Sequence, residues 1–486
     1  MTRVVIIGAY GSAGVAVADA LADEPDVELV LADNGDPGGG LCILRGCMPS
    51  KDVYSAAAHH YQTRVDDRLP GDPPDVDLER VVATKDEHVS TFAAHRRAAV
   101  DDLADRENVT FRHETATLTG EGTVRIGEET VDADYVVVAT GSTANVPDLP
   151  GLDSVPYRTS ADVLDATEFG DSALVMGFGY IGLEMVPYLS EVGGMDVTVV
   201  EHDERPLDEA DAPFGDELLD MYREEFDVDV LTNAYEQSVA PVGTGDTDEA
   251  GTADPTDEGV RLTYEQGGEE RQVEADELYL FTGRRPALDG LGLDAWGVGT
   301  DDEWVGATMQ ARDDERVFVV GDANGREPIL HVAKEQAQVA AANVLRHRDG
   351  ESLVEYHNTH HHVVFSGLSV YPYARVGHSE TSAAEAGLDA FSVTREASSD
   401  GVFKTKDTPR GLARLVVGED GTVLGYQGLH YHADVMAKTM QVVVEGGLDV
   451  RTVPDRAYHP TTPEILDGLF REAKEELDVP DPTEPI

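Results

Sequence analysis

The two cysteines of the chain lie close together, at positions 42 and 47, in the glycine-rich stretch 38–51. An alanine-rich segment with a helical pattern, residues 53–58, follows this stretch. Two cysteines about one helical turn apart can close a small disulfide, and a helix N-terminus with the nearby Lys51 favours the reactive thiolate form. They cannot complete a four-thiolate zinc site, and no histidine lies at zinc-finger spacing from them. We therefore interpret Cys42 and Cys47 as a redox pair rather than as inert core residues.

Two strand-to-helix units carry glycine fingerprints. In each unit an apolar strand runs into spaced glycines and a helix, and a second strand ends in an acidic residue. The residues are Gly8, Gly11, Gly14 and Asp33 in the first unit, and Gly177, Gly179, Gly182 and Glu201 in the second. Glycines let the backbone approach a pyrophosphate at a helix N-terminus, and the acid binds ribose hydroxyls. Because the two units lie about one domain length apart, we predict that one chain binds two nucleotides.

The composition limits the classes of function. At 486 residues with 41% hydrophobic content, the chain is expected to fold into about two to four domains. Its 95 acidic and 36 basic residues give a net charge of −59. Concentrated salt shortens the Debye length to about 3 Å at 1 M and screens such self-repulsion, which indicates an extremely halophilic host. The same charge argues against nucleic acid and anionic membranes as partners.

The sequence also predicts the location of the protein. It contains no apolar run of about 18 residues, the length that a membrane-spanning helix needs. The N-terminus enters a strand pattern at Val4 without the basic and apolar regions of a signal peptide. We therefore expect a cytoplasmic protein without a membrane segment.

Two further apolar strands end in motifs that contain a glycine. The strand 135–138 runs into Ala139-Thr140-Gly141, and the buried strand 317–320 runs into Gly321-Asp322-Ala323, which opens a helix at 330–345.

The rest of the chain predicts connecting helices and a third domain. Residues 75–107 have a helical pattern, and the acidic segment from Gly243 to Gly259 indicates a surface loop in a hairpin of the second nucleotide unit. After residue 352, alternating strands followed by two helices predict an α+β domain.

Several motifs together carry a family resemblance. They are the two-cysteine stretch, Ala139-Thr140-Gly141, Gly177 to Gly182 followed by Glu184, Gly283-Arg284-Arg285-Pro286, Gly321-Asp322-Ala323 and the C-terminal His459-Pro460-Thr461-Thr462-Pro463-Glu464. With these, essentially the whole chain resembles the pyridine nucleotide–disulfide oxidoreductase family, the group of glutathione reductase, dihydrolipoamide dehydrogenase and mercuric reductase. The resemblance implies an α/β fold with two Rossmann-like nucleotide-binding domains, for FAD and NAD, plus a C-terminal α+β dimerisation domain. The expected segments are 1–152 and 283–351 for FAD, 153–282 for NAD(P), and 352–486 for the dimer interface.

The resemblance assigns catalytic roles to individual residues. Cys47 would form the thiolate that faces the flavin, and Cys42 would be the interchange thiol that attacks the substrate disulfide. His459, reaching in from the other subunit, would be the acid and base, with its imidazole oriented by Glu464. Lys51 and Glu184 resemble the ion pair that the family places beside the reactive nitrogen of the flavin.

The resemblance also implies which residues hold the cofactors. Asp322 would bind the ribityl chain of FAD, next to Ala323. The other cofactor-binding positions are Lys51, Thr140, Gly141, Gly283 and the two fingerprints with Asp33 and Glu201. Because a carboxylate at position 201 accepts a hydrogen bond from the ribose 2′-hydroxyl and repels a 2′-phosphate, NADH is favoured over NADPH, although His202 and Arg205 lie close by.

Some positions depart from the family pattern. Tyr10 adds a residue to the first glycine loop, and Leu41 stands where the family usually has threonine. Ala457 replaces the first histidine of the His-x-His-Pro form that is common in dihydrolipoamide dehydrogenases. The lack of a further cysteine pair disfavours mercuric reductase and high-molecular-weight thioredoxin reductase.

Other positions allow a second interpretation. Asp322 could also cap the helix that follows it, and Arg45 could be a plain surface charge or attract an anionic substrate. The histidines that invite a metal site are His360, His361, His362, His430 and His432. A solvated or interface cluster explains them as well, so we expect no metal.

The expected reaction passes electrons from NAD(P)H through FAD and the Cys42–Cys47 disulfide to a small disulfide, in a homodimer with shared active sites. In a halophilic archaeon the resemblance makes bis-γ-glutamylcystine a candidate substrate. The alternative is dihydrolipoamide, with the chain as part of a 2-oxoacid dehydrogenase complex. Two other possibilities are a flavoprotein diaphorase that does not use the cysteines and an interaction module with a degenerate site.

Overall fold

The computed structural model describes residues 1–243, 259–301, 303–456 and 458–477. The interior of the predicted acidic loop, residues 244–258, and Ala457 lie outside the described residues. The chain forms two compact units that are each built from separate stretches of sequence. The first comprises Met1–Asp52, Val82–Asn145 and Arg284–Asn358, and the second comprises Val53–Val81, Val146–Gly283 and Thr359–Ile486.

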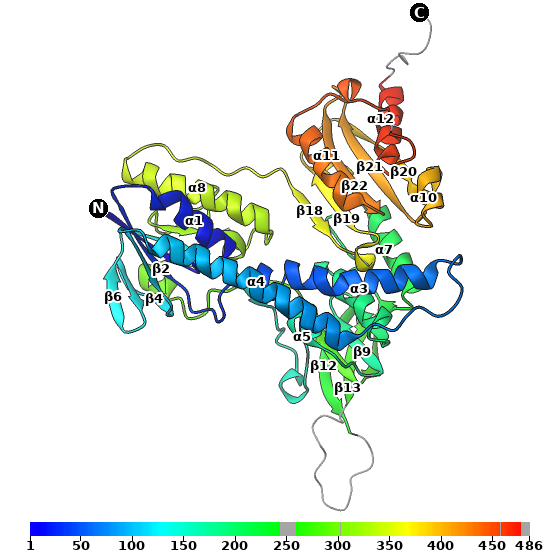
Figure 1. The fold of residues 1–486 in the computed structure, drawn as a ribbon, viewed down its shortest axis with the longest axis horizontal. Helices are drawn as coiled ribbons and strands as arrows, with labels where there is room; N and C mark the ends of the chain where they lie inside the picture. The colour runs from blue at the N-terminus through cyan, green and yellow to red at the C-terminus, as the bar shows by residue number, and fades with distance from the viewer. Residues whose placement is uncertain (244–258, 302, 457, 478–486) are drawn as a thin grey trace, which may run out of the picture. The chain divides into compact units, whose positions relative to one another are not determined.

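A five-stranded parallel sheet with the order β17-β7-β1-β2-β3 forms the centre of the first unit (Figure 1). Its strands are β1 (Thr2–Ile7), β2 (Val27–Ala32), β3 (Val109–Arg112), β7 (Tyr135–Val138) and β17 (Val317–Val319). Helices α1 (Ser12–Ala22) and α8 (Leu330–Arg348) pack against each other, and their apolar side chains share a core with the sheet. Because all five strands are parallel, the loops after β1, β7 and β17 meet at the carboxyl edge.

Smaller elements complete the first unit. The redox stretch forms α2 (Leu41–Leu44) and the start of α3 (Cys47–Val65), and α3 and α4 (Leu78–Ala104) both continue from one unit into the other. The remaining elements are β4 (Ala116–Gly120), β5 (Thr123–Ile126), β6 (Glu129–Asp132), β8 (Ser142–Ala144), β16 (Arg284–Pro286) and the 3₁₀ turns η2 (Leu293–Trp296) and η3 (Gly321–Asn324).

The second unit contains a second parallel sheet, with the order β11-β10-β9-β15, and an antiparallel sheet, β12-β13-β14. The strands are β9 (Ser172–Met176), β10 (Asp196–Val200), β11 (Asp229–Leu231), β12 (Ala234–Val242), β13 (Gly259–Gln266), β14 (Glu269–Ala275) and β15 (Glu277–Leu280). The helical elements of this part are η1 (Leu152–Ser154), α5 (Ser160–Asp165), α6 (Tyr180–Glu191) and α7 (Ala212–Glu225).

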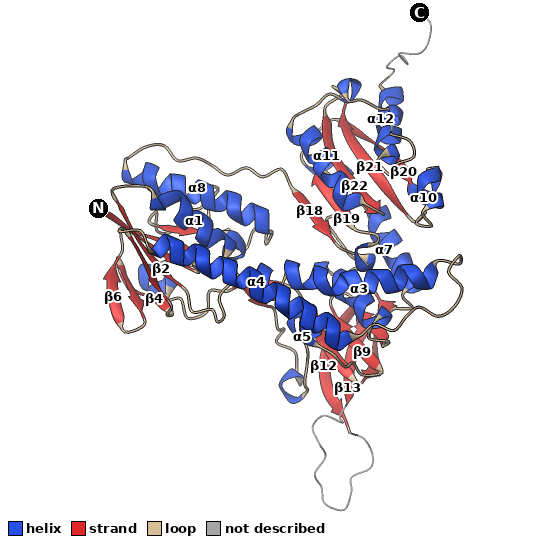
Figure 2. Ribbon diagram, in the orientation of Figure 1, coloured by secondary structure: helices blue, strands red, loops and turns tan. Residues whose placement is uncertain are grey.

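The C-terminal part of the second unit is an antiparallel sheet with helices packed on it (Figure 2). Helix α11 (Ala433–Glu445) packs against β19 and β22, and α12 (Glu464–Glu476) packs against β20 and β21. The sheet order is β18-β19-β22-β21-β20. The strands are β18 (His361–Val364), β19 (Tyr373–Gly377), β20 (Ala390–Glu396), β21 (Gly411–Gly418) and β22 (Val423–His430). The short helical elements are η4 (Gly367–Ser369), α9 (Glu380–Glu385), η5 (Ala397–Ser399), α10 (Gly401–Thr405) and η6 (Val450–Thr452).

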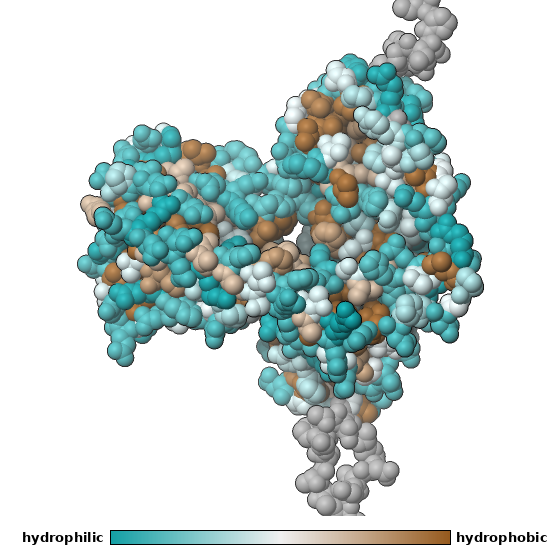
Figure 3. All heavy atoms as spheres, viewed as in Figure 1, coloured by the Kyte–Doolittle hydropathy of each residue, from teal (hydrophilic) through white to brown (hydrophobic). Residues whose placement is uncertain are grey.

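The structure confirms the predicted fold class, with two parallel-sheet nucleotide folds and a C-terminal α+β part. The predicted boundaries after residues 152, 282 and 351 stay predictions. Within the described ranges, no helix is long and apolar enough to cross a membrane. The face shown in Figure 3 is largely hydrophilic, in line with the 95 acidic residues, and apolar patches lie on the C-terminal part near α11.

Candidate active site

Cys42 and Cys47 lie in consecutive short elements of the first unit. Cys42 is in α2, and Cys47 is the first residue of α3, so its sulfur lies at a helix N-terminus. No disulfide joins the two residues in the structure. The pKa of the Cys42 thiol is raised well above its ordinary value, first by a hydrogen bond with Cys47 and then by burial. Cys42 therefore keeps its proton, while the helix N-terminus favours a thiolate on Cys47.

The backbone before Cys42 is packed tightly against the first glycine loop. Gly38 and Gly40 have φ angles of +72° and +76°. A Cβ at Gly38 would lie 2.6 Å from the Tyr10 ring, and a Cβ at Gly40 would lie 3.1 Å from Cα of Gly11. Tyr10, the residue that lengthens the glycine loop, therefore packs against the redox loop, the glycine-rich stretch 38–51 that carries the two cysteines. Larger residues at 38 or 40 would displace it.

Arg96 of α4 is a charged neighbour of this site that the sequence did not reveal. Its guanidinium donates to the carbonyl of Tyr10 at 3.0 Å and to Oγ of Ser12 at 3.4 Å. Burial lowers the pKa of Arg96, and its charge interacts with Cys42. Arg96 lies far from every motif in the sequence, so only the tertiary contact identifies it.

The first glycine fingerprint forms a close-packed turn at the carboxyl edge of the sheet. A Cβ at Gly8 would lie 2.3 Å from the carbonyl oxygen of Ala139, and a Cβ at Gly14 would lie 2.1 Å from that of Gly8. The neighbouring residues Thr140 and Gly141 differ from these two glycines. Oγ1 of Thr140 is buried and has no hydrogen-bond partner among the described residues, and a Cβ at Gly141 would have no neighbour within 4 Å. An orphaned hydroxyl beside an open glycine fits a ligand such as FAD at this edge.

The acidic residues predicted for FAD are both held by hydrogen bonds. The Asp33 carboxylate accepts from the backbone N–H of Tyr10 at 2.8 Å and of Gly35 at 2.7 Å. Asp322 accepts from Oγ of Ser142 at 2.6 Å. The alternative prediction that Asp322 caps the next helix is wrong. It lies in the 3₁₀ turn η3, before buried Ala323, and α8 begins only at Leu330 after an Ile329 cap.

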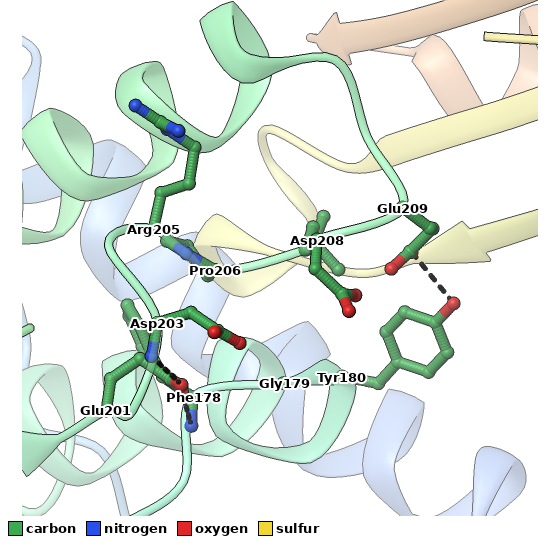
Figure 4. Close-up of a pocket in the computed structure, with 10 residues that line it drawn as sticks. Phe178, Gly179, Tyr180, Glu201, Asp203, Arg205, Pro206, Asp208 and Glu209 are labelled. Atoms are coloured by element: carbon green, nitrogen blue, oxygen red, sulfur yellow. Dashed lines mark hydrogen bonds between the residues drawn. The ribbon is translucent and has the colours of Figure 1, made fainter. Parts of the chain in front are cut away.

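The second fingerprint borders a cavity of about 390 Å³, shown in Figure 4. A Cβ at Gly182 would lie 2.5 Å from the carbonyl oxygen of Gly177, which repeats the packing of the first fingerprint. In contrast, a Cβ at Gly179 and at Gly283 would meet nothing within 4 Å. The cavity is lined by Phe178, Gly179, Tyr180, Glu201, Asp203, Arg205, Pro206, Leu207, Asp208 and Glu209.

Glu201 is fixed at the edge of this cavity. Its carboxylate accepts from the backbone N–H of Phe178 at 2.8 Å and of Asp203 at 3.0 Å (Figure 4). Asp33 is held in the same way in the first unit, by one N–H of the glycine loop and one N–H two residues further along. The two predicted ribose-binding acids therefore have equivalent surroundings.

The basic side chains near Glu201 contact acidic residues. Arg205 donates through Nε to Asp216 at 2.8 Å and lies 3.3 Å from Glu204. His202 Nε2 is hydrogen-bonded to the Glu236 carboxylate, and its ring stacks on Tyr235 at a centroid distance of 5.1 Å. The lining of the cavity therefore offers more carboxylates than cations to a bound nucleotide.

Glu209 and His362, which the sequence did not reveal as site residues, hold Tyr180 in the cavity wall. Its hydroxyl donates to Glu209 at 2.8 Å (Figure 4), and its ring lies 5.2 Å from the imidazole of His362. His362 Nε2 is 3.4 Å from Glu209. Burial raises the pKa of Glu209, but the contact with His362 and the hydrogen bond from Tyr180 outweigh it and hold the pKa at about 2. The Glu209 carboxylate is therefore ionised at neutral pH.

His459 and Glu464 form a hydrogen-bonded pair in the second unit. Nδ1 of His459 lies 3.0 Å from Oε1 of Glu464, which also accepts from the backbone N–H of Thr461 at 2.9 Å. The His459 side chain is 80% exposed, whereas Glu464 is 21% exposed. The pair thus presents an oriented imidazole at the surface of the protomer.

The predicted partners Lys51 and Glu184 belong to different units. Lys51 lies one turn after Cys47, and its Nζ donates to Oγ of Ser50 at 3.2 Å. The Glu184 carboxylate accepts from the backbone N–H of Phe365 at 3.1 Å. Their pairing stays a prediction. For the histidine-rich segments, the described residues contain no group of three or more ligands that could hold a metal ion.

The comparisons with known proteins agree with this geometry. Residues 2–342 match the family model for pyridine nucleotide-disulphide oxidoreductase, and residues 362–469 match the dimerisation domain of the same enzymes. The chain belongs to the pyridine nucleotide-disulphide oxidoreductase family.

Its relatives include enzymes with different substrates. The chain is 28% identical to a mercuric reductase of Streptomyces lividans, covering 94% of this chain and 92% of the relative. It is also 28% identical to the dihydrolipoyl dehydrogenase of Haloferax volcanii, covering 96% and 94%. Among solved structures, LpdA from Mycobacterium tuberculosis shares the fold with a TM-score of 0.79 and 21% identity, covering 97% of this chain and 99% of that one.

Membership in this family establishes the general class of the protein. It is an oxidoreductase that contains FAD and depends on NAD(P)H, and its dimerisation domain indicates a homodimer. The substrate differs among the relatives, so it is not fixed by family membership.

Proposed function

We propose that the protein reduces a small disulfide with electrons from NADH, through FAD and the Cys42–Cys47 pair. The observation that carries this proposal is the shared hydrogen bond of the two thiols at the N-terminus of α3. A proton held by Cys42 and a thiolate favoured at Cys47 give the two sulfurs different roles. We also propose the predicted cytoplasmic location and a halophilic host, which the acidic composition supports.

Bound FAD supplies the transfer of an electron pair from the nicotinamide to the Cys42–Cys47 disulfide. Gly141 and the Thr140 hydroxyl would face it, with Asp322 and Asp33 at the sugar-like parts of the cofactor. Once the disulfide is reduced, the Cys42 sulfur attacks the substrate disulfide and releases one thiolate. Cys47 then attacks Cys42, which re-forms the Cys42–Cys47 bond and releases the second thiol.

The proton transfers require a base and an acid beside Cys42. In the proposed homodimer, His459 of the partner subunit takes the Cys42 proton and gives it to the departing thiolate. The Glu464 carboxylate at Nδ1 holds the imidazole with Nε2 toward the sulfurs. The exposure of His459 on one protomer supports a site that a second protomer completes.

The cavity beside Glu201 supports NADH as the electron donor. Both oxygens of Glu201 are oriented by backbone N–H groups, so the carboxylate is placed to accept from a ribose hydroxyl. A 2′-phosphate would meet Glu201 and Asp203, while Arg205 and His202 are engaged by Asp216 and Glu236.

Two substrates fit the proposal. Bis-γ-glutamylcystine, a disulfide, is the first candidate for a halophilic host. Dihydrolipoamide, a dithiol that the same electron path would oxidise in the reverse direction with NAD⁺, is the second. The second is favoured by the 28% identity with the dihydrolipoyl dehydrogenase of Haloferax volcanii and weakened by Ala457. Diaphorase activity toward quinones or metal ions, without the cysteines, is the alternative from another class.

Steady-state assays of the wild type and of Cys42→Ser separate these functions. Bis-γ-glutamylcystine and lipoamide are offered with NADH in molar salt, and quinone reduction serves as the internal control. The proposal expects Cys42→Ser to lose disulfide reduction and to keep quinone reduction. Equal disulfide reduction by both proteins would assign the activity to a route that does not use the cysteines.

A further inference from the structure

His432 lies at a strained backbone position next to the segment that carries His459. It precedes α11 as its N-cap, with φ 70° and ψ 21°, a left-handed conformation that non-glycine residues rarely adopt. Such strain persists only where the surroundings fix the residue, and it often accompanies a functional constraint. The contacts of His432 identify that constraint.

The imidazole of His432 is hydrogen-bonded to Thr462, in the segment that carries His459. Nδ1 lies 3.2 Å from Oγ1 of Thr462. Thr462 is only 5% exposed, while His459, three residues earlier, is 80% exposed. Thr462 also accepts the backbone N–H of Ile465 in the first turn of α12. Thr462 is thus a buried anchor between His459 and Glu464.

His432 is itself held by an ordered group of aromatic residues. Its ring stacks on Tyr431 at a centroid distance of 3.8 Å and an interplanar angle of 30°. The carbonyl of Tyr431 accepts from Nδ1 of His430 at 3.0 Å. Nε2 of that fully buried histidine therefore accepts from the Tyr426 hydroxyl at 3.0 Å. The end of β22 and the start of α11 form a rigid support for the His432 ring.

We propose that His432 is a positioning residue for the disulfide half of the reaction. Through Thr462 it fixes the segment 459–464 and thereby the place of the His459 imidazole. The inference rests on the proposed role of His459, and neither the family motif nor the redox loop includes position 432. Acid–base catalysis depends steeply on such placement, since a shift of about 1 Å can cost up to about 100-fold in rate.

Two disulfides distinguish this role from general structural damage. An alkyl disulfide such as bis-γ-glutamylcystine releases a thiol of ordinary pKa, which needs a proton from His459. The aromatic disulfide 5,5′-dithiobis(2-nitrobenzoate) releases a thiolate of low pKa that departs without one. Both reactions need the imidazole as the base that takes the Cys42 proton, but only the first also needs it as an acid. A misplaced imidazole therefore slows the first reaction more than the second.

The test uses the holoenzyme, reduced with NADH and mixed rapidly with each disulfide. For His432→Ala and for Thr462→Val we expect reoxidation by bis-γ-glutamylcystine to slow about tenfold or more, reoxidation by the aromatic disulfide to slow less, and the NADH step to be unaffected. His432→Asn, which tolerates the left-handed backbone and keeps a polar side chain, should recover part of the rate. His357→Ala, at an 81% exposed histidine, is the matched control.

Amide hydrogen exchange provides a readout that is independent of activity. We expect faster exchange across 459–464 in His432→Ala and no change in His357→Ala. An unchanged alkyl-disulfide rate, or equal slowing with both disulfides, would overturn the inference. His459→Gln distinguishes a failure of the proposed function from a failure of the positioning role of His432. Full alkyl-disulfide activity in that variant refutes the proposed function itself, whereas its loss together with a neutral His432→Ala refutes the positioning role alone.

Discussion

The Glu464 carboxylate lies 3.0 Å from Nδ1 of His459 and binds the backbone N–H of Thr461 with the same oxygen. This double contact fixes both the ring and the segment that carries it. Because Nδ1 faces the carboxylate, Nε2 is the nitrogen that can exchange a proton with a thiol. The relationship is the same as in a hydrolytic triad, where a carboxylate orients the base without accepting its proton.

Substituting Glu464 tests this orientation. In Glu464→Gln the amide no longer compensates the imidazolium charge, so we expect reduction of an alkyl disulfide to fall about 10-fold to 100-fold. Reduction of the enzyme by NADH should be unchanged. Stopped-flow measurement of the two half-reactions checks the prediction. Glu475→Gln, an exposed acid on the same helix, is the control, and slowing of the NADH half-reaction in Glu464→Gln would contradict it.

The choice of nicotinamide nucleotide depends on Glu201. We expect the wild type to prefer NADH by its kcat/KM, and Glu201→Gln to reduce the NADH-to-NADPH ratio of kcat/KM about tenfold. The reason is that Glu201→Gln removes the charged acceptor for the ribose hydroxyl of NADH and relieves the repulsion of the 2′-phosphate of NADPH. Asp229→Asn removes one charge at the opposite end of the same parallel sheet and should leave the ratio unchanged. A wild-type preference for NADPH would contradict the role of Glu201.

Glu209 should contribute to acid stability. Its pKa of about 2 in the folded protein lies below its ordinary value of 4.5. Between these pH values the unfolded chain binds more protons, so this stability is complete above pH 4.5 and is lost as the pH falls toward 2. Its upper limit is about 3 kcal/mol.

Urea unfolding at a series of pH values checks the Glu209 prediction. Glu209→Gln should be less stable than the wild type near neutral pH, and the difference should shrink as the pH falls through this window. Asp229→Asn serves as the control for loss of a surface charge. A difference between wild type and Glu209→Gln that stays constant with pH would show that the carboxylate charge is not the cause.

The net charge of −59 predicts a strong salt requirement. At low ionic strength the carboxylates repel one another and the anionic NADH, while molar salt screens both effects. We expect the activity and the thermal midpoint of unfolding to rise as the KCl concentration is raised from about 0.1 M to several molar. Over that range the Debye length falls to about 3 Å or less. Full activity and stability in dilute buffer would refute a halophilic host.

The sequence predicted those parts of the site that depend on local geometry. Gly14 and Gly182 must be glycines because the helix backbone approaches the preceding strand at each, and this spacing is visible in the sequence. Contacts between distant segments were not predictable. Tyr180, Glu209 and His362 come from three separate segments, and Arg96 reaches the first glycine loop from α4. No local periodicity records such tertiary contacts.

The alternative interpretation of Asp322 as a helix cap failed for a related reason, while its predicted contact with FAD stays a prediction. A strand that ends in Gly-Asp-Ala before an apolar helix suggests a helix cap. The chain instead forms a 3₁₀ turn first, and Asp322 binds the Ser142 hydroxyl of another strand while α8 begins at Leu330. The side-chain partner was 180 residues away in sequence, so only the folded sheet could reveal it.

Anaerobic titration of the purified protein with NADH tests most directly whether Cys42 and Cys47 form the redox pair beside the flavin. We predict a long-wavelength absorbance band from a Cys47 thiolate against the flavin when the wild type is reduced. Cys42→Ser, which retains Cys47, should show the band before any NADH is added, and Cys47→Ser should never show it. Reduction of the wild type directly to a bleached flavin, with identical spectra for both variants, would contradict the account.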